Sequence, residues 1–181
     1  MYKRVSIPKK SGTPRPKSSL ITLIPFNDIL TWPERTEDSL DVTGNITLKA
    51  DAKAINLYAT ASTISRNDST EGDPDAEGFI QNLVFDHPGN SKEFETFVQK
   101  FLGEPFIVIT DECGDNSGRR MHGWKCNPIF FTPEEQDNNE AVKTTLTWAT
   151  RLRSKLKSGY YLGEMPAVAD VATEGSSDGG L

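Results

Sequence analysis

Residues 90–110 read NSKEFETFVQKFLGEPFIVIT and combine the two clearest signals in the chain, a helix followed by a buried strand. Apolar residues recur on one helical face, at Phe94, Phe97, Val98, Phe101 and Leu102. Asn90 is placed to cap the helix with Glu93 as its reciprocal partner, and Gly103 and Pro105 end it. We predict one short α-helix over about residues 91–102, whose phenylalanines must pack on a sheet because three turns are not stable alone.

The residues around this helix predict a mostly β fold. Residues 106–110 form a nearly continuous apolar run, typical of a strand covered on both faces. Residues 46–64 and 79–85 alternate with a period of two, which is typical of half-buried antiparallel strands. A final strand is predicted with one apolar face, formed by Val142, Leu146, Trp148 and Leu152. Loops or turns are expected at residues 67–78, 113–125 and 134–140.

Charge divides the chain of 181 residues, whose net charge is −6, into three parts. Residues 1–19 carry +6 and are rich in proline and serine, so we expect a flexible basic arm. Residues 20–162 are expected to form the β domain, and residues 163–181, which carry −4, an acidic tail. The predicted fold is thus an antiparallel β-sandwich or barrel flanked by one helix, with extended terminal arms.

The sequence assigns no catalytic, cofactor-binding or metal-ligating residue. Twelve residues, His122 among them, separate Cys113 from Cys126, which does not match the paired spacing of zinc sites. The acidic neighbours of Cys113 oppose a reactive thiolate. The chain contains no phosphate-binding glycine loop and no nucleotide fingerprint.

Two further hypotheses concern ligands. Acidic residues gather in the predicted loop at Glu71, Asp73, Asp75 and Glu77, but their spacing does not match an EF-hand, so a solvated loop is favoured over a calcium site. Trp32, Trp124 and Trp148 would allow single-stranded nucleic acid to stack on an exposed sheet. The acidic body opposes that role, and Trp148 shares a predicted face with apolar residues, which favours the core.

The order of elements resembles the tail tube proteins of tailed bacteriophages and the tube proteins of contractile injection systems. The resemblance runs from about Gly78 to Leu152 and centres on residues 93–102, 106–110, 136–140 and 144–148. It is a resemblance of pattern rather than of a diagnostic motif. It implies a β-sandwich or barrel with one flanking helix, hexameric rings that stack into a tube, and an acidic lumen through which genomic DNA passes without specific binding.

The resemblance implies a structural virion protein, made in the host cytoplasm, that is not an enzyme and whose partners are other copies of itself and other virion proteins. The basic arm, the acidic loop at 67–78 and the tail are the segments expected to reach neighbouring subunits. No membrane partner is expected, since no apolar run approaches the ~20 residues of a span. Two alternatives stay open: another virion component, such as a neck, terminator or completion protein, and a single-stranded nucleic-acid-binding β-barrel.

Overall fold

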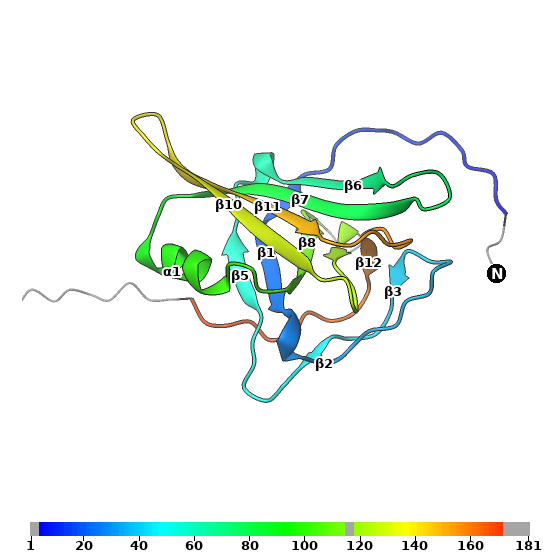
Figure 1. Cartoon of the computed structure of the whole chain (residues 1–181), viewed down its shortest axis with the longest axis horizontal. Helices are drawn as coiled ribbons and strands as arrows, with labels where there is room; N and C mark the ends of the chain where they lie inside the picture. The colour runs from blue at the N-terminus through cyan, green and yellow to red at the C-terminus, as the bar shows by residue number, and fades with distance from the viewer. Residues whose placement is uncertain (1–3, 115–117, 172–181) are drawn as a thin grey trace, which may run out of the picture.

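A computed structural model describes residues 4–114 and 118–171 of the chain (Figure 1). Within these residues there is one α-helix, α1 (Lys92–Phe101), among many strands. The strands are β1 (Lys17–Pro25), β2 (Ile29–Thr31), β3 (Asp41–Val42), β4 (Thr47–Leu48), β5 (Ile55–Tyr58), β6 (Ser65–Glu71), β7 (Gly78–Pro88), β8 (Phe106–Glu112), β9 (Arg120–His122), β10 (Ile129–Asp137), β11 (Val142–Thr150) and β12 (Gly159–Tyr161). The predicted mostly β fold with one helix is confirmed.

Ten strands form one sheet that curls into a half-barrel. The strand order is β3-β12-β9-β8-β10-β11-β7-β6, and β1 joins it by pairing with β8 and with β5. The two limbs of the sheet meet where Phe106 of β8 pairs with Ile129 of β10. Strands β2 and β4 form a separate pair. Because strand pairing joins the limbs at that one position, the sheet can fold back around its core.

Strand β8 separates two hydrophobic clusters, which explains its continuous apolar sequence. Phe106 and Val108 lie in the cluster that also contains Trp148 and the face of α1. Ile107 and Ile109 lie in a second cluster on the opposite face. The prediction that both faces of this strand are covered is therefore confirmed, and β8 has the central position that its sequence indicated.

Helix α1 covers the first cluster, as its stripe predicted, but its ends differ from the prediction. Phe94 is buried, and Phe97, Val98 and Phe101 pack against the cluster. The cap is Ser91, whose hydroxyl accepts a hydrogen bond from the Phe94 backbone N–H, and not Asn90. Asparagine and serine are both favourable N-cap residues, so the sequence alone did not show whether Asn90 or Ser91 caps the helix. Leu102 lies beyond the last helical residue and is 59% exposed, so it is not part of the stripe.

Two predicted loops are partly strands. The first half of the predicted loop at 67–78 belongs to β6, which pairs with β7 along its whole length. The predicted turn at 134–140 is mostly strand, because β10 continues to Asp137 and pairs with β11. Both segments lie at edges of the sheet where polar side chains face solvent. They therefore lack the apolar alternation that marks a half-buried strand.

Two smaller predictions also change. The predicted loop at 113–125 contains strand β9, which pairs with β8. Leu146 and Trp148 of the final strand are fully buried as predicted, but Val142 is 38% exposed and Leu152 is 61% exposed. Val142 opens the strand at the hairpin end and Leu152 follows its last residue, so both lie beyond the part of the face that the core covers.

The chain outside residues 20–162 contributes to the body on both sides. Strand β1 begins at Lys17, inside the segment expected to be a flexible arm. After β12 the chain runs back along the body, where the Ala54 N–H donates to the Ala167 carbonyl and the Ala169 N–H donates to the Ala54 carbonyl. Met165 and Val168 pack against the second cluster. The acidic positions Glu174 and Asp178 lie outside the described residues.

Candidate assembly site

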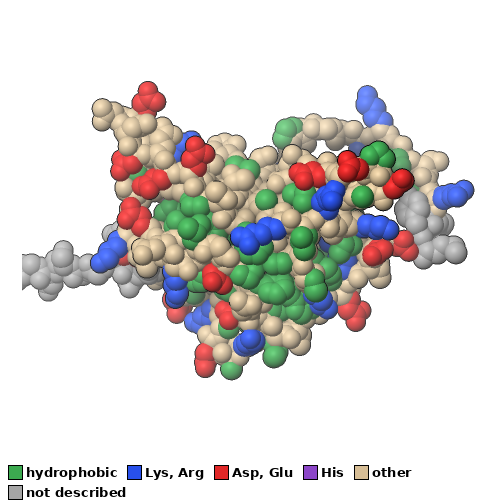
Figure 2. All heavy atoms as spheres, in the orientation of Figure 1, with side chains coloured by type: hydrophobic (Ala, Val, Ile, Leu, Met, Phe, Trp, Pro, Cys, Tyr) green, Lys and Arg blue, Asp and Glu red, His purple; other side chains and the backbone are tan. Residues whose placement is uncertain are grey.

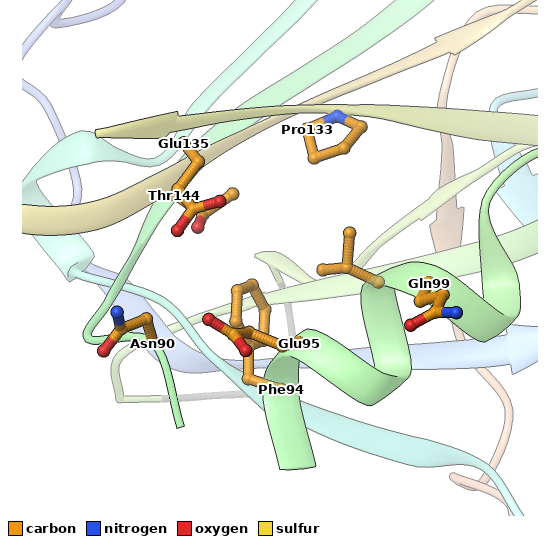
Figure 3. Close-up of a pocket in the computed structure, with 8 residues that line it drawn as sticks. Asn90, Phe94, Glu95, Gln99, Pro133, Glu135 and Thr144 are labelled. Carbon is orange, nitrogen blue, oxygen red and sulfur yellow. The ribbon is translucent and has the colours of Figure 1, made fainter. Parts of the chain in front are cut away.

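A groove of about 450 Å³ lies between α1 and the β10–β11 hairpin (Figure 3). Phe94, Val98 and Pro133 give it an apolar surface. Glu95 from the helix and Glu135 from the hairpin place carboxylates at it. The groove therefore combines apolar contact area with negative charge, which suits an apolar segment that also carries basic side chains.

One wall of this groove is an unpaired strand edge. Beyond Ile129, the edge of β10 that faces away from β11 pairs with no strand in the described part of the chain. Pro133 lies within this strand, a position that proline tolerates at an edge because the edge needs no complete hydrogen-bond ladder. Free N–H and C=O groups along such an edge are a template on which an extended chain can add as another strand.

The hairpin that carries this edge projects beyond the body at the upper left of Figure 1, and β7 holds its second strand almost as far as the turn, where Lys143 pairs with Pro88. Asp86 of β7 accepts hydrogen bonds from Lys143 Nζ and from Thr145 Oγ1, each at 2.7 Å. Burial raises the pKa of Asp86, but these hydrogen bonds and the Lys143 charge outweigh it, so the pKa lies below its usual value. Acidic side chains line the projecting part, as Figure 2 shows at the upper left.

The basic arm lies at the other end of the molecule (Figure 1). Residues 4–13 have no secondary structure and are exposed throughout. Val5 is 56% exposed and Ile7 is 81% exposed, so the arm presents two apolar side chains at strand spacing. The root of the arm is held, because the Cys113 N–H donates to the Pro16 carbonyl. An apolar, basic segment at one end and an apolar, acidic groove at the other make a complementary pair of surfaces.

The residues considered for metal or thiol chemistry lie apart from this groove. Cys113 and Cys126 are exposed free thiols, and Cys126 lies in the tight turn that joins Trp124 to Asn127. Among the described residues, no group of three or more His, Cys, Asp or Glu side chains is placed to hold a metal ion. The acidic loop keeps Asp73, Asp75 and Glu77 exposed in the short turn between β6 and β7.

The three tryptophans differ in their availability for stacking. Trp148 is fully buried, as predicted, and cannot stack on a base. Trp32 and Trp124 are half-buried and meet edge to face at 5.9 Å. Lys125 Nζ lies 5.9 Å and 5.8 Å from their ring centres. Little of either indole ring is left exposed for a base to stack on, since each ring already packs against the second cluster.

His122 is a core residue rather than a ligand that acts with the cysteines. It is 0% exposed, and Nε2 lies 3.3 Å from Thr110 Oγ1 while Nδ1 has no partner in the described structure. Burial, and then the charges of Arg66 and Arg120, lower the pKa of His122 from 6.5 to about 3. This histidine is therefore neutral across the physiological range.

We expect the free energy of unfolding to fall as pH drops below about 6.5, because the unfolded chain then protonates His122 while the folded chain does not. The contribution is fully present above pH 6.5 and is lost progressively toward pH 3, with an upper limit of roughly 4–5 kcal/mol. Urea unfolding between about pH 7.5 and about pH 5 measures this contribution to the free energy of unfolding. That range lies above the pH values at which protonation of carboxylates dominates the pH dependence of stability. The variant His122→Gln should lose this slope; an unchanged slope in that variant would contradict the assignment.

Comparisons with models of protein families, with curated proteins and with solved structures find no match to this chain. Within the described residues, no helix has the length and apolar character needed to cross a membrane. The groove, the unpaired edge and the arm are therefore interpreted from their own geometry.

Proposed function

We propose that this chain is a structural subunit that assembles with copies of itself, and that its role is that of a phage tail tube protein. One observation carries the proposal: an unpaired strand edge beside α1 lies at one end of the molecule, and an exposed extended arm lies at the other. Unlike surfaces at opposite ends join copies head to tail, and such contacts give closed rings or open filaments.

In this proposal the arm of one copy lies along β10 in the groove of the next copy. Val5 and Ile7 would cover Phe94 and Val98, and the backbone of the arm would extend the sheet at the edge of β10. Lys9 and Lys10 would face Glu95 and Glu135. Opposite charge across the contact would orient the arm and speed its docking.

The curled sheet also supports this role. A ring-forming β protein must cover its edges, and the arm would cover the β10 edge that the described chain leaves unpaired. The projecting hairpin and the arm provide the reach between neighbouring subunits. The rings would stack into a channel through which genomic DNA passes without specific binding. Other virion roles, such as a neck or terminator protein, would use the same contacts in a single ring.

Electron microscopy of the purified chain in negative stain tests the proposal. Rings or rods are the expected result, and light scattering should show large particles whose amount rises with concentration. A uniformly monomeric chain at the highest concentration reached would overturn the proposal. Binding to labelled single-stranded oligonucleotides that weakens with salt, without assembly, would instead support the nucleic-acid alternative.

Reversal of the groove charges is expected to block assembly while the subunit stays folded. The double variant Glu95→Lys/Glu135→Lys places positive charge against the basic arm, so assembly should need at least roughly tenfold more protein. Sedimentation of assembled particles measures the effect. Glu34→Lys/Glu37→Lys is the matched control, since both residues are exposed acids outside the groove. Equal assembly of the groove variant and the control would show that the arm does not bind there.

Adding Lys9→Glu/Lys10→Glu to the groove variant should restore assembly, because the two charges then exchange sides. Restoration would tie the arm to the groove directly. If the groove variant assembles poorly and Lys9→Glu/Lys10→Glu does not restore its assembly, the arm binds at a site other than the groove.

A further inference from the structure

A polar pocket of about 340 Å³ lies between β6, β9 and the segment before β12, and it shares no lining residue with the groove. It is lined by Arg66, Asn67, Asp68, Arg120, Lys157 and Ser158. These residues come from β6, from β9 and from the segment before β12. Arg35, which follows β2, adds a fourth cation, since its Nη2 donates to the Lys157 carbonyl at 2.7 Å.

Two of these arginines are held in fixed positions. Arg66 donates to the Gly118 carbonyl and pairs with Glu112. Arg120 donates to the Ser158 carbonyl and to the Tyr160 hydroxyl, and its guanidinium stacks 3.7 Å from the centre of the Tyr160 ring. Groups held in this way lose little conformational entropy when they bind a ligand.

The positive charge of the pocket exceeds its negative charge. Glu112 compensates Arg66, and Asp68 lies in the electrostatic field of Arg35. Asp68 Oδ2 accepts hydrogen bonds from the Ser158 N–H and hydroxyl, while Oδ1 is buried. Among the described residues, no carboxylate lies within ion-pair distance of Arg120 or Lys157.

Neighbouring groups respond to this excess of positive charge. Burial and then the charges of Arg66 and Arg120 lower the pKa of His122. Burial and Arg120 also lower the pKa of Arg35, against the opposing effect of Asp68. Like charges brought together in a protein whose net charge is −6 cost stability, and a bound anion would remove that cost.

We propose that this pocket is an oxyanion site, which binds a phosphate or carboxylate group through Arg120 and Lys157. A guanidinium presents parallel N–H donors that match the two oxygens of such a group, and the Lys157 ammonium adds a second positive charge at the pocket. The pocket and the groove share no lining residue, so binding of a small free anion does not depend on the assembly proposal, whereas binding of an acidic side chain from a second copy rests on it.

Two sources can supply this chemistry: a small free anion, or an acidic side chain of a second copy. Calorimetric titration of the full chain with inorganic phosphate, and separately with glutarate, at constant ionic strength tests both. Saturable binding of at least one anion is expected. Lys157→Gln should weaken it by about fivefold and Lys157→Glu should abolish it. Lys155→Glu is the matched control, since Lys155 is exposed, two positions away and not in the pocket lining.

The outcomes separate the sources. If the chain binds phosphate, and this binding is lost in Lys157→Glu but kept in Lys155→Glu, the pocket is a site for a small free anion. Glutarate binding with the same pattern, together with weaker assembly of Glu134→Gln/Glu140→Gln, supports an acidic hairpin as the ligand; both of these residues are exposed and outside the groove lining. No saturable binding of either anion, or equal binding by Lys157→Glu and the natural chain, would overturn the proposal.

Discussion

Removal of residues 1–16 is expected to leave a folded monomer that no longer forms rings or rods. The truncation ends where β1 begins, at Lys17, so every strand of the sheet is kept. Between the removed and the kept residues it breaks the ion pair of the largely exposed Arg15 with Glu112, the hydrogen bond from Lys17 Nζ to the Arg15 carbonyl, and the hydrogen bond that the Cys113 N–H donates to the Pro16 carbonyl. These three largely exposed interactions together contribute roughly 1–2 kcal/mol after solvent screening.

The loss of assembly, in contrast, should be complete, because the arm is the segment proposed to cover the β10 edge. Light scattering and negative-stain microscopy measure assembly, and urea unfolding checks that the monomer is intact. A chain whose arm has the same composition in scrambled order is the control. Partial assembly of this chain would show that the charge of the arm is enough to drive some assembly. No assembly would show that the order of Val5, Ile7 and the lysines matters. Normal assembly of the truncated chain would remove the arm from the mechanism.

Replacement of Trp148 by alanine is expected to lower the free energy of unfolding by about 3–5 kcal/mol. Trp148 is fully buried at the centre of the first cluster. Its ring centre lies 5.0 Å from that of Phe131 and 5.6 Å from that of Phe106. Alanine would leave a cavity between the two limbs of the sheet, and this loss is a large fraction of the stability of a typical domain.

Trp148→Phe should cost much less than Trp148→Ala. The indole N–H of Trp148 is buried without a hydrogen-bond partner in the described structure, so phenylalanine removes an unsatisfied donor while it fills most of the space. Leu102→Ala is the surface control, since Leu102 is 59% exposed and lies beyond the last residue of α1. Denaturant unfolding of the three variants gives the comparison. A loss below about 1 kcal/mol for Trp148→Ala would place this residue outside the cooperative core.

The four cations of the polar pocket illustrate a site that could not be predicted from the sequence. Arg35, Arg66, Arg120 and Lys157 are far apart in the chain, and none belongs to a motif. They meet because β6 and β9, and the segment leading into β12, lie close together. Pairing between strands that are distant in sequence carries this information, and it leaves no local pattern.

The groove was only half predictable for a related reason. The apolar stripe of α1 follows from its spacing, and so does the need for a sheet beneath Phe97. The outer half of β10 carries the other wall, and its sequence is typical of a polar turn. A strand edge that projects into solvent buries neither face, so no periodic apolar signal marks it.

By itself, the sequence determined helix α1, the doubly covered strand β8 and the burial of Trp148. These elements bury large apolar side chains, and the spacing of such side chains reports the local period of the backbone. The tertiary structure decided the rest: the strands β6, β9 and outer β10, the return of the chain along the body after β12, and the meeting of distant arginines. Those features depend on hydrogen bonds between strands and on charges brought together by the curl of the sheet, which are properties of the folded chain rather than of any short stretch of it.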